Sequence, residues 1–73
     1  MRPTFKGLNG REFKAGLGDW IGDRDGRSGT VVSCVYDDTL KETVFTVDPS
    51  VGVMLEVRES LVTFCYIEEE DKA

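Results

Sequence analysis

The chain has 73 residues, of which 40% are hydrophobic and 32% charged, and its formal net charge is −5. This length allows one small domain, and the composition is that of a globular rather than a disordered protein. No apolar run approaches the ~20 residues of a membrane span, and the N-terminus lacks the apolar core of a signal peptide. We therefore expect a cytoplasmic protein that does not contact a membrane.

Basic and acidic side chains are unevenly divided along the chain. Residues 1–14 hold four basic residues and one acidic residue, a net charge of +3, so the remaining residues carry −8. The acidic majority repels phosphates, which disfavours direct nucleic-acid binding. The same charge favours docking on the basic surface of a larger protein.

Catalytic and metal chemistry would lack its usual side chains in this sequence. The chain contains no histidine and two cysteines, Cys34 and Cys65. It therefore cannot form a four-ligand zinc site or a cysteine–histidine pair. Both cysteines lie in apolar runs, so we expect reduced core thiols, with a disulfide between neighbouring strands as the alternative. The sequence predicts a protein that is not an enzyme and has no cofactor and no metal.

Two further acidic sites are candidates for chemistry: the Asp23-Arg24-Asp25-Gly26 loop as a calcium site, and Asp19 as an acid or base. Aligning Gly26 with the invariant glycine of a calcium loop places Ile21 and Val32 where ligands belong, so a turn is expected there instead. Asp19, beside Trp20, is the carboxylate that we consider for acid–base chemistry. The alternative is that Asp19 caps a turn or faces water.

The N-terminal part is predicted to form an arm and a short helix. Residues 1–8 show no periodicity, and we expect them to be a flexible basic arm. The single folded domain would span residues 9–67. It would begin with a helix that Asn9 caps and Glu12 closes through a capping box, with Phe13 anchoring the helix to the domain.

Strand patterns fill the rest of the chain up to an acidic tail at residues 68–73. The Asp25-Gly26 pair predicts a type I′ turn with positive φ at both residues. Asp37 or Asp38 is expected to make an Asx bond in the next turn. The last strand has apolar residues on both faces, which predicts either burial on both sides or a position under the helix. The five expected strands are 17–24, 28–36, 42–47, 52–58 and 61–67.

Several turn residues resemble those of the SH3-like small barrels, including the KOW-type members associated with nucleic acids. They are the Gly18-Asp19-Trp20-Ile21 opening, the Asp25-Gly26 hairpin and the tight Arg58-Glu59-Ser60-Leu61 corner. The resemblance covers residues 17–67 and implies a half-open barrel. We therefore predict a mainly β (α+β) fold, with a short N-terminal helix before a four- to five-stranded antiparallel sheet or half-open SH3-like barrel.

Size and charge also resemble those of small phage-encoded regulators of host RNA polymerase. The sequence thus predicts a monomeric regulator that binds a larger protein such as RNA polymerase or another nucleic-acid enzyme. One alternative is an SH3-like nucleic-acid-binding domain, and another is a structural subunit that assembles through sheet edges. The candidate partner-binding residues are Lys6, Arg11, Lys14, Arg24, Arg27, Glu68, Glu69 and Glu70.

Overall fold

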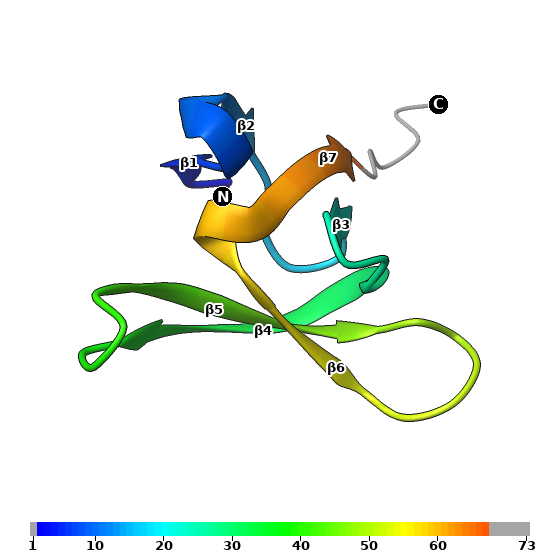
Figure 1. Ribbon diagram of the computed structural model, residues 1–73. Coiled ribbons are helices and arrows are strands. Elements are labelled where there is room, and N and C mark those ends of the chain that lie inside the picture. The colour runs from blue at the N-terminus through cyan, green and yellow to red at the C-terminus, as the bar shows by residue number, and fades with distance from the viewer. Residues whose placement is uncertain (1, 68–73) are drawn as a thin grey trace.

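The computed structural model describes residues 2–67, which form seven β-strands and two 3₁₀ turns without an α-helix (Figure 1). The strands are β1 (Thr4–Lys6), β2 (Glu12–Lys14), β3 (Trp20–Asp23), β4 (Ser28–Asp37), β5 (Glu42–Asp48), β6 (Leu55–Arg58) and β7 (Val62–Tyr66). The 3₁₀ turns are η1 (Leu8–Gly10) and η2 (Glu59–Leu61). The predicted mainly β, antiparallel class is confirmed, and the five expected strands correspond to β3–β7 with shifted ends.

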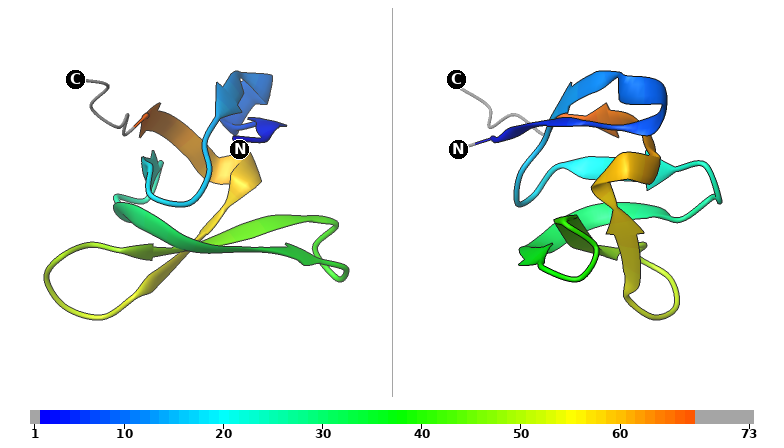
Figure 2. Two further views of the ribbon diagram at one scale, coloured as in Figure 1. Left: turned by 180° about the vertical axis from the view of Figure 1, so that it is seen from behind. Right: turned by 60° about the vertical axis from the view of Figure 1, so that its left-hand side comes forward.

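The strands form two antiparallel sheets. β1 and β2 pair as a hairpin, and the other five strands lie in the order β6-β5-β4-β3-β7. The last strand of the chain therefore returns beside β3, and η2 makes the corner from β6 into β7 (Figures 1 and 2). The register of β4 against β5 shifts between Val31 and Ser33. A bulge of this kind bends a strand, so the sheet curls around its inner face without closing into a barrel in the part described.

The predicted N-terminal helix is wrong. Asn9 has a φ of 61° and Gly10 a φ of 77°, both in the left-handed region. The Gly7 N–H donates to the Arg11 carbonyl at 2.6 Å, which closes a tight reversal between β1 and β2. Asn-Gly is the commonest pair in such reversals because both residues tolerate positive φ. Asn9 therefore turns a hairpin instead of capping a helix.

Residues of the expected N-terminal arm belong to the hydrophobic core. Phe5 lies opposite Phe13 in the β1–β2 hairpin, and only 9% of its surface is exposed. Its ring centroid is 5.2 Å from that of Phe45 and 6.0 Å from that of Phe13. The hairpin thus covers one side of the curled sheet with aromatic side chains, which a detached arm would not do.

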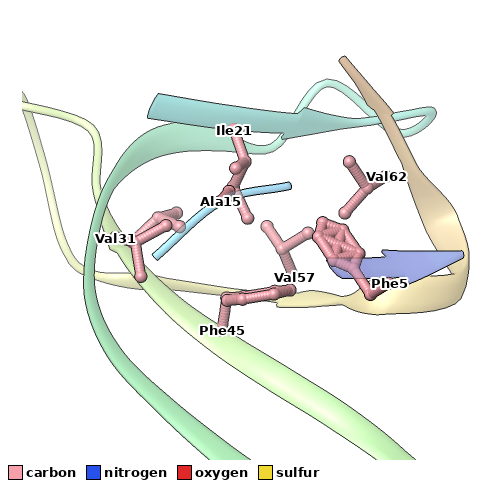
Figure 3. Packing of buried hydrophobic residues seen from close by; sticks show 8 residues of the cluster. Phe5, Ala15, Ile21, Val31, Phe45, Val57 and Val62 are labelled. Carbon is pink, nitrogen blue, oxygen red and sulfur yellow. The ribbon is translucent and has the colours of Figure 1, made fainter. Parts of the chain in front are cut away.

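The core gathers side chains from both sheets, as Figure 3 shows. Side chains alternate between the two faces of a strand, so Ile21 points inward while its neighbour Trp20 is only half-buried. Ile21, and not the larger Trp20, is therefore the residue that anchors β3 in the core. Burying a Val, Ile or Phe side chain stabilises a fold by about 1.5–3 kcal/mol. The buried hydrophobic residues are Phe5, Ala15, Ile21, Val31, Phe45, Val47, Val57 and Val62.

Of the two turn geometries predicted for the central hairpins, one is wrong and one is confirmed. Between β3 and β4, Gly26 has a φ of 86°, whereas Asp25 does not have positive φ, so the predicted type I′ geometry is wrong. The Asp23 carboxylate accepts hydrogen bonds from the Asp25 and Arg27 N–H groups, both at 2.9 Å. These two bonds fix the backbone conformation of the turn. The predicted Asx bond is confirmed, because Asp37 accepts from the Thr39 N–H at 2.8 Å.

Two expectations about burial fail. β7 is not buried on both faces, because the side chains of Phe64 and Tyr66 are exposed. Cys34 is exposed and Cys65 half-buried, and both are free thiols, so neither the core position of Cys34 nor a disulfide is found. On β7, Phe64 and Tyr66 share the outward face of the sheet with Trp20. Cys34 is exposed although it lies opposite the core residue Phe45. Strand periodicity alone did not distinguish these faces from core.

Candidate functional site

A pocket with a volume of about 680 Å³, which we call the groove, is lined by residues of the β3–β4 turn, the β4–β5 hairpin, β6 and η2. Its lining combines apolar side chains with ionisable ones. The apolar residues are Val35, Leu40, Val44, Met54, Leu55 and Leu61. The polar and charged residues are Asp23, Arg27, Asp37, Thr46, Glu56 and Arg58.

Strand register explains why part of this lining shares one surface. Val44 of β5 lies opposite Val35 of β4 on one side and Arg58 of β6 on the other. Residues directly opposite in a sheet point to the same face. Phe45, the next residue along β5, points to the core. The groove is therefore floored by the outer face of the same three strands that bury the core.

An ion pair fixes one wall of the groove. The Arg58 guanidinium donates from Nε to Glu42 Oε2 at 2.8 Å, and Nη2 is 2.6 Å from the same oxygen. The other carboxylate oxygen of Glu42 accepts from the Ser60 N–H at 2.9 Å. Glu42 itself is buried. The pair therefore ties the start of β5 to β6 and η2.

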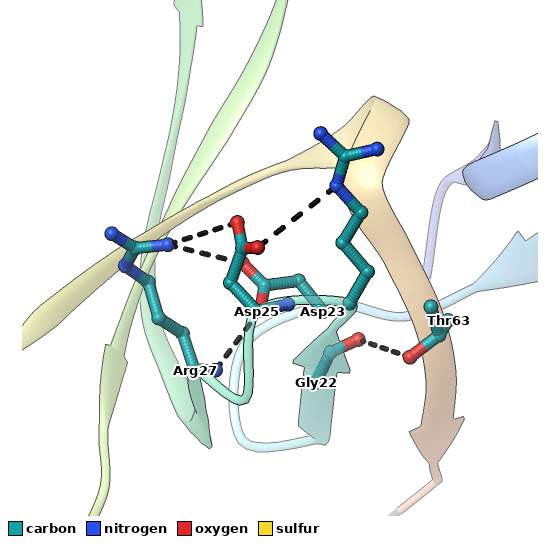
Figure 4. Close-up of polar contacts among 6 residues, drawn as sticks. Gly22, Asp23, Asp25, Arg27 and Thr63 are labelled. Atoms are coloured by element: carbon teal, nitrogen blue, oxygen red, sulfur yellow. Dashed lines mark hydrogen bonds and ion pairs between the residues drawn. The ribbon is translucent and has the colours of Figure 1, made fainter.

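A second charged cluster stands at the β3–β4 turn (Figure 4). The Arg27 guanidinium lies 3.3 Å from the Asp25 carboxylate and 3.8 Å from that of Asp23. Asp23 is buried and holds the turn through its backbone hydrogen bonds. Arg24 extends from the same turn, with its Nε 4.0 Å from Asp25. The exposed pairs of Arg24 and Arg27 with Asp25 contribute about 0–1 kcal/mol each, so they leave the arginines able to contact a partner.

Glu42 is the groove-side carboxylate with a displaced pKa. Burial alone would raise the pKa of Glu42, but hydrogen bonds from Ser60 and Arg58, together with the guanidinium charge, bring the pKa below its ordinary value. A carboxylate with a lowered folded-state pKa stabilises the fold above its unfolded pKa. That contribution is lost as the pH falls through the folded-state pKa.

We expect Glu42→Gln to flatten the pH dependence of stability on the acid side. At pH 6.5 the variant should be less stable than the wild type, because glutamine cannot form the ion pair with Arg58. The gap in the free energy of unfolding should narrow as the pH is lowered to an acid value at which the wild-type carboxylate is protonated. Urea unfolding at the two pH values measures this gap. If the free energy of unfolding falls by the same amount in both proteins between the two pH values, folding does not lower the pKa of Glu42.

The predicted partner-binding residues that lie within residues 2–67 belong to two different hairpins. Lys6 and Lys14 are exposed on the outer face of the β1–β2 hairpin, and the Arg11 guanidinium carbon lies 5.2 Å from the centre of the Phe13 ring. Arg24 and Arg27 lie on the β3–β4 turn, and Arg27 lines the groove. The predicted residues Glu68, Glu69 and Glu70 lie outside the described residues.

Val35 and Leu40, two apolar residues of the groove lining, were not predicted from the sequence. Val35 and Leu40 flank the tight turn of the long β4–β5 hairpin, and Met54 precedes β6. All three are exposed. The available signal is their position beside turns, where an apolar side chain has few neighbours to bury it. Nothing in the sequence says that β6 brings Met54 toward the other two.

Neither a metal centre nor a membrane-spanning helix is found in residues 2–67. No group of three or more metal-ligating side chains occurs in this range. None of its helical segments has the length and apolar character needed to cross a bilayer. Asp19 is fully buried and accepts a hydrogen bond from the Gly16 N–H at 2.8 Å, in agreement with the turn-capping alternative.

Comparisons with protein-family models, curated proteins and solved structures found no match to this chain. The groove and its chemistry are therefore the basis for assigning a function.

Proposed function

We propose that this chain is a small acidic, non-enzymatic regulator that docks on a larger protein and receives a segment of that protein in its groove. The groove carries the proposal, because it places exposed Val35, Leu40 and Met54 around one concave surface. Apolar side chains grouped on a soluble protein in this way are typical of interaction sites. The ion pairs at the walls supply polar contacts that can fix the register of a bound segment.

The charge distribution favours protein over nucleic acid as the ligand of this groove. Its acidic side chains, Asp23, Asp37 and Glu56, outnumber Arg27 and Arg58. The whole chain carries a net charge of −5. A nucleic-acid enzyme such as RNA polymerase is a suitable partner class, since its surface must be basic to hold phosphate.

The proposed fold of the domain is a half-open SH3-like barrel. Support comes from the strand order β6-β5-β4-β3-β7, in which the first and last strands of the unit are neighbours, and from the 3₁₀ turn before the last strand. The groove lies at the end of this unit where η2 and the two central hairpins meet. A fold of this kind hosts many functions, so the groove and not the fold supports the assignment.

A paired substitution in one loop tests the proposal. Met54 lines the groove, whereas its neighbour Val53 is 76% exposed and does not. In capture from cell lysate after nuclease treatment, the wild type should retain one major protein partner. Met54→Asp should reduce the amount captured about tenfold or more, because it places a charge where an apolar contact is desolvated. Val53→Asp should leave capture unchanged.

Three results would overturn the proposal. They are capture that disappears with nuclease, equal capture by the two variants, and the absence of any specific partner. The unfolding transitions of Met54→Asp and Val53→Asp are compared first, since both side chains are exposed and both variants should fold like the wild type.

A further inference from the structure

A second surface lies on the outer face of β3 and β7. In the register of the sheet, Tyr66 lies opposite Trp20, Trp20 opposite Thr30, and Thr30 opposite Asp48. Opposed residues share a face, so one row of side chains crosses four strands. The alternate position, Ile21, is fully buried, which places this row on the outside of the sheet.

The neighbouring row adds a second exposed ring. Phe64 lies opposite Gly22, and a Cβ built on Gly22 would come within 2.3 Å of the Phe64 ring. The missing side chain at Gly22 therefore lets the ring lie directly over the backbone of β3. Phe64 and Tyr66 contact each other edge to face, with ring centroids 6.2 Å apart. We call Trp20, Phe64 and Tyr66 the aromatic face.

The aromatic face is accessible to a ligand. Tyr66 is 69% exposed, Phe64 is 41% exposed, and Trp20 is half-buried. Tyrosine and tryptophan are enriched at interaction surfaces, because each can bury a large apolar area there. Their ring faces carry negative electrostatic potential, which attracts a cation placed over them.

Charge on and beside the aromatic face selects a cationic ligand. Asp48 stands in the same row as Trp20 and Tyr66. Among the described residues at these register positions, none is basic. This combination repels phosphate and complements a positively charged peptide.

We propose that the aromatic face binds an arginine-bearing extended segment of a partner protein. A guanidinium group stacks on an aromatic ring and donates to a carboxylate at the same time, which a lysine ammonium does less well. The Asp48 carboxylate stands in the same row as Trp20 and Tyr66. One of its oxygens accepts from the Ser50 N–H at 2.9 Å. In the proposed complex the other oxygen accepts from the guanidinium, whose plane stacks on the rings of Tyr66 and Trp20. None of these residues lines the groove, so the inference stands or falls separately from the proposed function.

Trp20 is the single tryptophan of the chain and therefore reports binding directly. The probe is an eight-residue peptide with blocked ends that alternates arginine and serine. Titration into the full chain at low salt should give a saturable change in Trp20 fluorescence. Tyr66→Ala should weaken binding about tenfold, since a desolvated cation–π contact is worth roughly that much.

Tyr36→Ala is the matched control, because Tyr36 is also an exposed tyrosine on a strand, at 58%, and lies outside the aromatic face. It should bind the peptide like the wild type. Tyr66→Lys provides a second variant at the exposed position and should abolish binding by placing a cation on the face.

Four outcomes would overturn the proposal. These are no saturable binding, equal losses in Tyr66→Ala and Tyr36→Ala, unchanged binding by Tyr66→Lys, and equally tight binding of a glutamate–serine peptide or a short oligothymidylate. Binding that survives Met54→Asp but fails in Tyr66→Ala would separate this surface from the groove.

Discussion

Replacing Phe5 by alanine should lower the free energy of unfolding by about 3–5 kcal/mol, the range for buried phenylalanines. Only 9% of the surface of Phe5 is exposed, and its ring packs between Phe45 and Phe13. Truncation would remove the transfer energy of the ring and leave a cavity between the β1–β2 hairpin and the main sheet. Chemical denaturation followed by circular dichroism measures the change.

The free energy of unfolding of a domain of this size is only a few kcal/mol, so we expect a large fraction of Phe5→Ala to be unfolded at room temperature. Phe5→Leu keeps most of the apolar volume and should cost about 1.5 kcal/mol or less. Phe64→Ala is the control, because Phe64 is 41% exposed and should cost clearly less than Phe5→Ala. If Phe5→Ala unfolds like the wild type, residues 1–8 are an arm after all and the hairpin does not close the core.

The strands after residue 17 could be predicted because their signals are local. Alternation and β-branched residues mark β4 and β5, and Asp37 supplies the turn between them. The prediction for the N-terminal part was wrong because Asn9 is compatible with two different structures. It is a good helix cap, and with Gly10 it is also a strong hairpin turn. What decides between them is the packing of Phe5 and Phe13 on Phe45, a contact distant in sequence.

The candidate surfaces were less predictable than the strands. The choice of Arg24 and Arg27 rested on their charge, and the structure explains their position through Asp23 and Asp25. The groove and the aromatic face depend on which strands are neighbours. Sequence patterns do not state that β7 returns beside β3, and without that pairing Tyr66 has no link to Trp20.

A buried ion pair provides the second large expected effect. The Arg2 guanidinium donates from Nε to Asp19 Oδ2 at 2.8 Å and from Nη2 to Oδ1 at 3.1 Å. The Asp19 side chain is 1% exposed, whereas that of Arg2 is 35% exposed. The pair therefore joins the N-terminal segment to the turn before β3 through a carboxylate that water cannot solvate.

Arg2→Met should lower the free energy of unfolding by about 3–5 kcal/mol, because it removes the guanidinium that pairs with the buried carboxylate of Asp19. Arg11→Met is the matched control; Arg11 is exposed, with its guanidinium over Phe13, and its loss should cost about 1 kcal/mol or less.

Adding Asp19→Asn to Arg2→Met removes the buried charge and should restore part of the lost stability, so the double variant should be more stable than Arg2→Met alone. Urea unfolding of the four proteins at pH 7 gives the comparison. The argument depends on that partial recovery: if Arg2→Met merely loses packing of its aliphatic stem, the second substitution will add its own cost and make the protein less stable still.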